Sequence, residues 1–282
     1  MPRKGCKIHI PNAALEHRMT INSSEIEICL SRRAILGHES ATQFSNLGIM
    51  QSPHDYNPAL LETILKKAKE IKAEHAIHRH LDLTYIPNAD AYIPEIRELL
   101  HDAARLERLS DLAGTRLEPY PISVIAATVT FMSAGNDGTL TWHNDGVPAT
   151  ELIPLEISDP IVGGELEVYR GVCEEGMARV AQNKELPADQ CIRVQHKLGY
   201  STLGQLHGIC HRTNPVRYGH RVTLNLNSYS VDMAHIDNNT LAYLAADNGN
   251  DRTAPWVEEY VEMAFGRQLD TYQASQAAPS IP

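Results

Sequence analysis

The feature that most constrains the fold is a series of short apolar segments, rich in β-branched residues, between residues 120 and 232. Turn residues, such as the Ser-Ala-Gly-Asn-Asp-Gly run that follows residue 132, separate the segments. We expect strands over residues 122–132, 139–143, 149–157, 163–171, 192–196, 201–211 and 221–231. About seven or eight short strands in one stretch predict a β-sandwich or a jelly-roll barrel.

Helical patterns flank this strand region. Residues 58–75 and 92–113 carry apolar side chains at helical spacing, and residues 255–269 predict a closing helix. No linker or internal repeat divides the chain, so we expect one domain over residues 1–282. Its parts would be a helix-rich portion (1–120), a jelly-roll core (121–232), and a C-terminal helix with a disordered tail (233–282). The predicted fold class is mainly β, a cupin-like jelly roll buttressed by N-terminal helices.

Charge and cysteine content limit the partners. The 25 Lys and Arg residues against 35 Asp and Glu give a net charge of −10, which argues against nucleic acid or an anionic membrane as partner. No apolar run has the length of a membrane span, and the N-terminus lacks a secretory apolar segment. The five cysteines are scattered without a Cys-X-X-Cys pair, which predicts reduced thiols and a cytoplasmic location.

Three residues are of the types that commonly bind a metal together, two histidines and an aspartate. His143 and Asp145 stand one residue apart in the segment Thr-Trp-His-Asn-Asp-Gly, so in a strand their side chains would point to the same face. His211 lies several predicted strands later. Two imidazoles and one carboxylate on one side of a metal leave three positions open, which is the facial triad expected for non-haem Fe(II) that binds O2 and an organic co-substrate. Asp145 as a mere turn cap is the alternative.

An arginine follows the third candidate ligand. Arg221 comes ten residues after His211 at the start of a predicted strand, and Thr223 lies on the same strand face. A guanidinium can bind a carboxylate through two hydrogen bonds, and a threonine hydroxyl can support it. The co-substrate is therefore expected to be an acid whose other end chelates the metal.

These residues resemble the motif of the Fe(II)- and 2-oxoglutarate-dependent oxygenases, which have the double-stranded β-helix fold. The family pattern is His-X-Asp, a distant His, and an Arg about ten residues later followed by X-Ser or X-Thr. The prolyl-hydroxylase-like branch has further fixed positions, which this chain matches at Pro215, Val216, Gly219 and Leu224. The resemblance covers residues 120–232. It implies Fe(II) on His143, Asp145 and His211, with 2-oxoglutarate held by Arg221 and Thr223.

The resemblance implies a dioxygenase that uses O2, most often for hydroxylation, and converts 2-oxoglutarate to succinate and CO2. Asp145 disfavours halogenation, because halogenating members have a small residue there. We expect a small-molecule substrate, an amino acid or an aminated metabolite, given the acidic charge. Alternatives are hydroxylation of a protein or peptide side chain, and a cupin-like metal-binding protein without redox turnover. The polar stretch 174–190 is interpreted either as a lid over the site or as a solvated helix.

Other histidines compete with the candidate ligands. His207 has the same strand parity as His211, but the Pro-Val and Arg spacing favours His211, which leaves His207 as a core or supporting residue. His220 should point away from the face of Arg221. A local cluster of His75, His78 and His80 is expected to be solvated.

Five further residues near the motif have expected positions. Thr128, Thr130 and Tyr200 are candidates for lining the cavity near the co-substrate, although strand threonines are usually only packed. Trp142 alternates away from the adjacent ligand and should pack outside the site. Cys210 should point away for the same reason.

Overall fold

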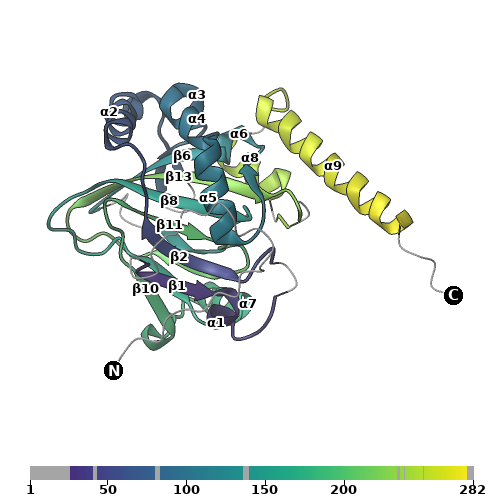
Figure 1. The fold of residues 1–282 in the computed structure, drawn as a ribbon. Coiled ribbons are helices and arrows are strands. Elements are labelled where there is room, and N and C mark those ends of the chain that lie inside the picture. The colour runs from purple at the N-terminus through teal and green to yellow at the C-terminus, as the bar shows by residue number, and fades with distance from the viewer. Residues whose placement is uncertain are drawn as a thin grey trace.

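Antiparallel strands form the centre of the molecule, with helices above and below them in the computed structural model (Figure 1). The structure describes residues 26–40, 43–79, 83–135, 140–233, 236–237, 239–249 and 251–277. Among these residues, no helix is both long enough and apolar enough to cross a membrane.

The larger sheet runs through the middle of the molecule. Its strand order is β1-β2-β11-β8-β13-β6-β4-β3, and β5 pairs with β13 beyond that path. Its strands are β1 (Ile28–Ser31), β2 (Leu47–Pro53), β3 (Ile77–Arg79), β4 (Leu83–Ile86), β5 (Leu117–Pro119), β6 (Ala127–Ser133), β8 (Ala149–Ile157), β11 (Tyr200–Gly204) and β13 (His220–Ser230). All pairs are antiparallel.

A smaller sheet has the order β10-β9-β12-β7. Its strands are β7 (Leu140–His143), β9 (Leu166–Tyr169), β10 (Cys191–Val194) and β12 (His211–Thr213). One cavity is lined by residues of both sheets, so the sheets face each other across it. Two antiparallel sheets that enclose a cavity confirm the predicted jelly-roll core.

Strand β13 shows why the sequence folds in this way. Because successive side chains in a strand point to opposite faces, Arg221, Thr223, Asn225 and Asn227 line the cavity, and the apolar residues between them point outward. The outward residues are Val222, Leu224 and Leu226. The polar residues of this alternating sequence therefore face the cavity, and the apolar residues face the hydrophobic core.

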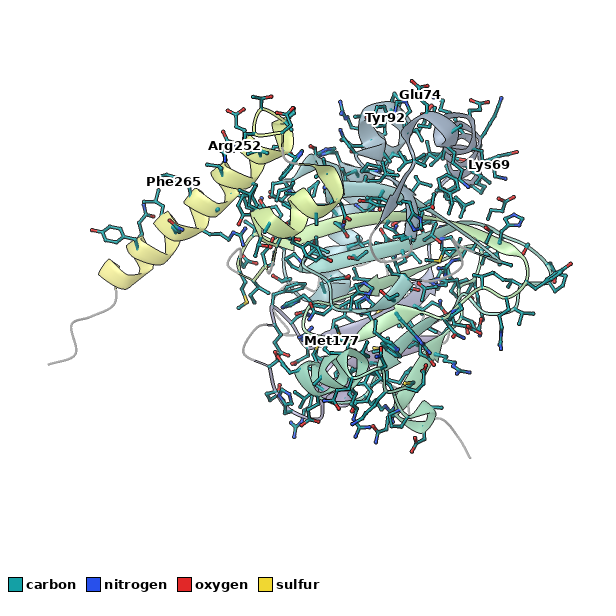
Figure 2. All side chains as sticks on the ribbon, turned by 180° about the vertical axis from the view of Figure 1, so that it is seen from behind. Lys69, Glu74, Tyr92, Met177, Arg252 and Phe265 are labelled. Atoms are coloured by element: carbon teal, nitrogen blue, oxygen red, sulfur yellow. The ribbon has the colours of Figure 1, made fainter. Side chains whose placement is uncertain are left out.

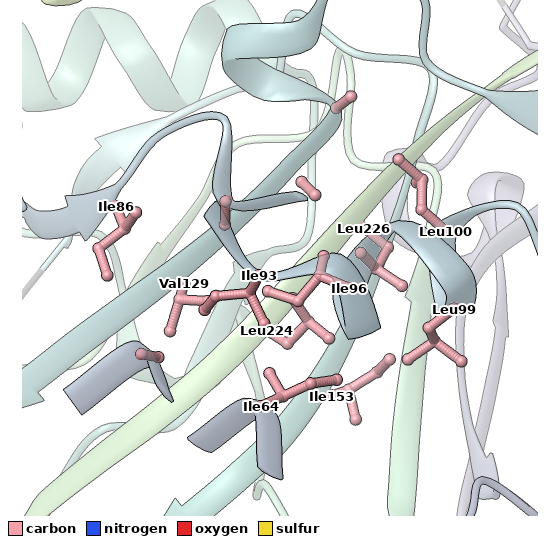
Figure 3. Packing of buried hydrophobic residues seen from close by; sticks show 14 of the residues in the cluster. Ile64, Ile86, Ile93, Ile96, Leu99, Leu100, Val129, Ile153, Leu224 and Leu226 are labelled. Atoms are coloured by element: carbon pink, nitrogen blue, oxygen red, sulfur yellow. The ribbon is translucent and has the colours of Figure 1, made fainter. Parts of the chain in front are cut away.

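The outward face of the larger sheet is covered by helices from the N-terminal part (Figure 3). Ile64 of α2 (Pro58–His75) and Ile96 and Leu99 of α4 (Pro94–Leu100) pack against Ile153 and Leu224 of the sheet. Burying such a side chain contributes about 1.5–3 kcal/mol each. The prediction that N-terminal helices buttress the core is confirmed, and α2 has the predicted bounds.

The predicted helix over 92–113 is wrong as a single helix. The segment contains the end of α3 (Ala89–Tyr92), all of α4 and α5 (Ala103–Ala113). Pro94 fits only the first turn of a helix, so α4 begins there. Asp102 begins α5, because its side chain accepts a hydrogen bond from the Arg105 N–H.

Two strand predictions also need correction. Within 122–132, residues Ser123–Ala126 form the short helix α6, and β6 begins only at Ala127. Residues 201–211 do not form one strand. Strand β11 ends at Gly204, and a turn then leads to β12. Gly208 lies in that turn and has a left-handed φ of +67°. The expected strand parity of His207 and His211 therefore does not apply.

The N-terminal part is less purely helical than expected. Besides α1 (Arg32–Leu36), α2 and the following helices, it contains β1 to β5, which pair with each other and with the core strands. A boundary near residue 120 therefore does not separate two kinds of structure, because the sheet continues across it.

The C-terminal part consists of α8 (Leu241–Asn248) and α9 (Pro255–Ala277). The predicted closing helix at 255–269 is present and longer than expected, because it continues into the segment predicted to be disordered. The last residues, 278–282, lie outside the described part of the chain. Helix α9 projects from the body, and Phe265 points away from it (Figure 2).

Candidate active site

Three side chains converge where the smaller sheet meets the cavity. His143 ends β7, His211 begins β12, and these two residues are partners in the ladder between the strands. Asp145 lies just beyond β7, and its Oδ1 is 3.4 Å from the Nε2 atoms of both histidines. The candidate ligand atoms all lie within 4.8 Å of one another. The predicted triad is therefore brought together, with Asp145 on a loop rather than in the strand.

Backbone carbonyls fix the tautomers of both imidazoles. Nδ1 of His143 lies 2.7 Å from the carbonyl oxygen of Thr141, and Nδ1 of His211 lies 2.8 Å from that of Ile209. A carbonyl only accepts, so Nδ1 carries the proton in both rings. In the neutral rings Nε2 then has a free lone pair directed toward Asp145, the arrangement that metal-binding histidines use.

Burial and the charges of the neighbouring ligands together shift the pKa values of His143, Asp145 and His211. Burial lowers the pKa of His143, and the neighbouring His211 lowers it further. Burial also lowers the pKa of His211, but the attraction of Asp145 outweighs it and the net shift is upward. Burial raises the pKa of Asp145, yet the two imidazoles hold it well below its usual range. The site thus keeps an ionised carboxylate between two imidazoles, which is a donor set for a divalent cation.

Arg221 lines the same cavity and makes no ion pair with a carboxylate of the described residues. Its side chain is 4% exposed, and its Nε and Nη1 atoms have no hydrogen-bond partner among the described residues. Its Nη2 lies 3.2 Å from the sulfur of Met132. Burial lowers the pKa of Arg221 to about 10, with only a weak opposing effect from Glu165. A buried guanidinium with unused donors favours an anionic ligand, because an unpaired buried charge is costly.

Thr223 extends the polar surface around Arg221. It is 2% exposed, lines the cavity, and its Oγ1 has no hydrogen-bond partner within the described part of the chain. The strand period places Arg221 and Thr223 on one face of β13, as the sequence predicts. Together they offer guanidinium and hydroxyl donors at one wall of the cavity.

The cavity has a volume of about 150 Å³ and is lined by both sheets and by α8. The wall near Arg221 includes the apolar residues Leu83, Met132 and Leu140. The lining also includes polar residues for which the sequence motif gave no indication. These are Asn225, Asn227, Asn239, Tyr243, Asp247 and Asn248.

Part of this polar wall had a usable signal in the sequence. In Arg-Val-Thr-Leu-Asn-Leu-Asn the period of two extends from Arg221 through Thr223 to Asn225 and Asn227. Asn239 and the α8 residues had none, because they reach the cavity through the chain reversal after β13.

Of the three other candidates for lining the cavity, two line it and one does not. Thr128 and Thr130 line it, which was the less favoured alternative to simple packing in a strand. Tyr200 is not among the described residues that line it; it pairs with Pro53 in the sheet, and the Lys197 ammonium lies 5.4 Å from its ring centroid. The prediction failed for Tyr200 because β11 begins there, at the end remote from the turn toward His211.

The residues expected to point away from the site do so. Trp142 and Cys210 pack together in a cluster on the outer side of the smaller sheet. His220 is exposed, and its Nε2 lies 3.4 Å from a carboxylate oxygen of Glu156. His207 is fully buried in the turn before β12 and does not belong to the described cavity lining, and its carbonyl accepts a hydrogen bond from Arg32.

The histidine cluster near residue 78 is outside the cavity. His75 stacks on Tyr92 with ring centroids 4.0 Å apart, and His78 lies on the exposed strand β3, with Nδ1 3.3 Å from the Thr84 hydroxyl. His80 lies outside the described residues.

The polar stretch 174–190 does not contact the cavity. It forms α7 (Cys173–Ala181) and the 3-10 turn η1 (Ala188–Gln190). Helix α7 packs through Cys173 and Met177 onto the outer cluster of the smaller sheet, and Figure 2 shows Met177 there. The lid interpretation is therefore wrong for this segment, since its apolar residues cover the outer sheet face. Among the described cavity-lining residues, the helical ones come from α8 and, at Ile125, from α6.

Comparison with known proteins gives a likeness at the level of structure. No family model matches the sequence, and no curated protein matches it. The fold is similar to that of AviO1 from Streptomyces viridochromogenes, with a TM-score of 0.51, 14% identity, and coverage of 65% of this chain and 90% of that chain.

Two further similar structures have lower TM-scores. The non-haem α-ketoglutarate-dependent carbocyclase SnoK from nogalamycin biosynthesis has a TM-score of 0.49 and 16% identity, covering 69% of this chain and 88% of that chain. A Pseudomonas putida prolyl-4-hydroxylase has a TM-score of 0.46 and 13% identity, covering 65% of this chain and 92% of that chain. At such identities it is the fold that is shared. The chain has a double-stranded β-helix fold, with a His-Asp-His cluster and a buried arginine in its cavity.

Proposed function

We propose that this protein is an Fe(II)- and 2-oxoglutarate-dependent oxygenase that oxidises a small molecule. The observation that carries the proposal is the pairing, in one cavity, of the His143–Asp145–His211 cluster with the buried guanidinium of Arg221, which makes no ion pair with the described residues. A simple metal-binding protein has no use for a buried arginine without a counter-ion. A co-substrate with a carboxylate at one end and a metal-chelating group at the other uses both.

The donor set suits Fe(II). Two neutral imidazole nitrogens and one carboxylate bind a divalent metal and leave positions for other ligands. The carbonyls of Thr141 and Ile209 would hold the two rings in the ligating tautomer. When bound, iron with 2-oxoglutarate would supply O2-dependent oxidation of a substrate C–H bond, with 2-oxoglutarate converted to succinate and CO2.

The chain's own residues provide binding, orientation and exclusion of water. Arg221 would bind the distal carboxylate of 2-oxoglutarate through its unpartnered nitrogens, and Thr223 would donate a further hydrogen bond. Leu83, Met132 and Leu140 line the cavity beside this group. A charge-assisted hydrogen bond is stronger in such surroundings than in water.

The cavity favours a small-molecule substrate over a peptide. Its volume is about 150 Å³ and α8 contributes to its lining beside the two sheets, which suits a compact ligand better than an extended chain. Hydroxylation is the reaction we expect, as the resemblance implies. A cytoplasmic location stays a prediction from the cysteine content; none of the four cysteines that the structure describes forms a disulfide with another described residue.

The test is an anaerobic titration of metal-free protein with Fe(II) and then with 2-oxoglutarate. We expect a weak visible charge-transfer band when the keto acid chelates the bound metal. Asp145→Ala should weaken metal binding itself, whereas Arg221→Met should bind Fe(II) normally and lose the band at moderate 2-oxoglutarate concentrations. His220→Gln is the matched control, because His220 is exposed on the same strand and points outward.

The outcomes separate the alternatives. A band in the native protein and in His220→Gln supports the oxygenase. Metal binding without any band, at saturating 2-oxoglutarate, contradicts it and leaves the metal-binding protein without redox turnover.

A further inference from the structure

Arg32, like Arg221, is buried and makes no ion pair with the described residues. It is the first residue of α1, its side chain is 0% exposed, and its Nε and Nη2 atoms have no hydrogen-bond partner in the described part of the chain. Burial lowers the pKa of Arg32 to about 10, so it remains charged at neutral pH. Unlike Arg221, it does not belong to the described lining of the cavity. Its partners must therefore be sought within the chain.

The third nitrogen of this guanidinium binds the turn between β11 and β12. Nη1 of Arg32 donates to the carbonyl oxygen of Gln205 at 2.6 Å and to that of His207 at 2.9 Å. A Cβ atom placed on Gly208 would lie 3.4 Å from Nη2, so the guanidinium also lies against this residue, whose φ is left-handed. One buried side chain thus contacts the turn at three positions.

This turn leads to the carbonyl that orients the third candidate ligand. The N–H of Ile209 donates to the carbonyl of Leu206 within the turn at 3.1 Å. The carbonyl of Ile209 accepts the hydrogen bond from Nδ1 of His211 at 2.8 Å. A hydrogen bond at one ring nitrogen orients the other toward a metal. The direction of Nε2 of His211 therefore depends on where the turn holds the Ile209 carbonyl.

The other imidazole of the cluster is held in a different way. Nδ1 of His143 donates to the carbonyl of Thr141, and both residues belong to strand β7, whose ladder with β12 fixes their backbone. Ile209 belongs to neither β11 nor β12. One imidazole is thus oriented by a strand, and the other by a turn that is bound to a side chain from a remote part of the sequence.

We infer that Arg32 is a positioning residue for the candidate metal site. By holding residues 205–208 it fixes the Ile209 carbonyl and, through that carbonyl, the ring of His211. A purely structural role is less suited to this residue, because a buried charge without a carboxylate partner seldom stabilises a fold. The inference rests on the part of the proposed function that places a divalent metal on the triad. It does not depend on 2-oxoglutarate.

The experiment measures Co(II) binding to metal-free native protein and to Arg32→Met. In the Co(II) form, each ligating imidazole gives one strongly shifted, exchangeable Nδ1–H signal in the proton NMR spectrum, assigned by nuclear Overhauser effects to Thr141 or Ile209. In Arg32→Met we expect the His211 signal to move or to disappear through exchange with water, while the His143 signal stays. The affinity for Co(II), measured against a competing chelator, should fall about tenfold. Arg32→Lys, which keeps the charge without the forked donors, should show a smaller change at the same signal.

Two control variants separate positioning from general destabilisation. Arg33→Met removes the neighbouring arginine of α1, which is exposed and pairs with Glu39 at 3.2 Å. Glu151→Gln removes the carboxylate of a buried ion-pair cluster away from the turn, and so weakens the fold without touching Arg32. Both variants should keep the Co(II) affinity and the two Nδ1–H signals of the native protein.

The outcomes are distinct from those of the 2-oxoglutarate titration. Unchanged signals and affinity in Arg32→Met, or equal changes of both signals in Arg32→Met and in Glu151→Gln, overturn the positioning role even if the 2-oxoglutarate band forms. If Arg32→Met does not fold, Arg32→Lys decides, and an unchanged His211 signal in that variant overturns the inference. A selective change at His211 in a protein that gives no 2-oxoglutarate band would overturn the oxygenase and leave the role of Arg32 standing.

Discussion

The larger sheet has buried arginines on both of its faces, and their surroundings differ in one respect. On the outer face, Arg105 and Arg108 meet Glu151 of β8, with nitrogen–oxygen distances of 2.8 and 2.9 Å. On the cavity face, Arg221 of β13 meets no carboxylate at ion-pair distance among the described residues. The outer arginines have a carboxylate partner within the chain, and we propose that Arg221 receives its carboxylate from a ligand.

The pKa shifts follow this difference. Burial raises the pKa of Glu151, but Arg105 and Arg108 outweigh it and lower it to about 2. Burial likewise opposes the charge on Arg108, yet Glu151 raises its pKa above the ordinary value. At Arg221 burial is almost unopposed, and the pKa falls to about 10. The comparison teaches that a buried charge indicates a binding site only where its counter-ion is missing.

The largest expected effect is on the outer cluster. Glu151→Gln leaves two buried guanidinium groups without their carboxylate, so we expect the free energy of unfolding to fall by about 3–5 kcal/mol. Urea denaturation measures it. Glu156→Gln is the matched control, because Glu156 is on the same strand and makes a partly exposed ion pair with Lys69; the loss there should stay below about 1 kcal/mol. Equal losses in both variants would contradict the distinction between the clusters.

The pH dependence of stability sharpens the same point. The pKa of Glu151 in the folded protein, about 2, is below its ordinary value of 4.5, so its stabilisation is complete above pH 4.5 and is lost as the pH falls toward 2. The shift corresponds to roughly 3 kcal/mol. We expect urea titrations in that interval to show a decline that is smaller in Glu151→Gln and unchanged in Arg221→Met.

Arg221→Met tests the inner cluster. It removes a buried charge that no carboxylate of the described chain compensates, so stability should stay constant or rise by up to about 2 kcal/mol. Affinity for 2-oxoglutarate should fall about 100-fold, which is ~2.7 kcal/mol. Anaerobic calorimetry with Fe(II) measures the affinity. A loss of stability comparable to that of Glu151→Gln, with unchanged affinity, would show that Arg221 is a structural residue.

The smallest effect is expected at Thr223. Thr223→Val keeps the shape and removes an unpartnered hydroxyl, so stability should not decrease. We expect 2-oxoglutarate affinity to fall about five-fold, as for one hydrogen bond worth ~1 kcal/mol. Thr213→Val, at another lining threonine, is the comparison variant and measures what any lining hydroxyl contributes.

The central residues of the site were predictable from the sequence because the residue types that the chemistry needs occur at a recognisable spacing. His143, Asp145, His211 and Arg221 match the motif of the resemblance position by position, and period-two alternation places Arg221 and Thr223 on one face of β13. The turn between β11 and β12 was not predictable from alternation, since Gly208 interrupts a run that reads as one strand.

Two further features, the polar cavity lining from α8 and the ion pairs of Arg105 and Arg108, could not be predicted from the sequence for another reason. Asn239 and Asp247 belong to a segment that returns to the cavity after β13, and Arg105 finds Glu151 across the packing of α5 on the sheet. Such contacts depend on how whole helices pack against the sheets, and a local sequence pattern does not predict that packing. The same kind of docking places the segment 174–190, for which a lid and a solvated helix were both open, on the outer face of the smaller sheet.

The alternation of β13 has a consequence for how this chain can change through insertions and deletions. One face of the strand carries Arg221 and Thr223, and the other carries Val222 and Leu224 of the helix-covered core. A single inserted or deleted residue between 221 and 227 would exchange the two faces beyond that point, exposing apolar side chains to the cavity and driving polar ones into the core. Single substitutions along this strand change one side chain each, whereas a change in its length would disturb every residue beyond that point.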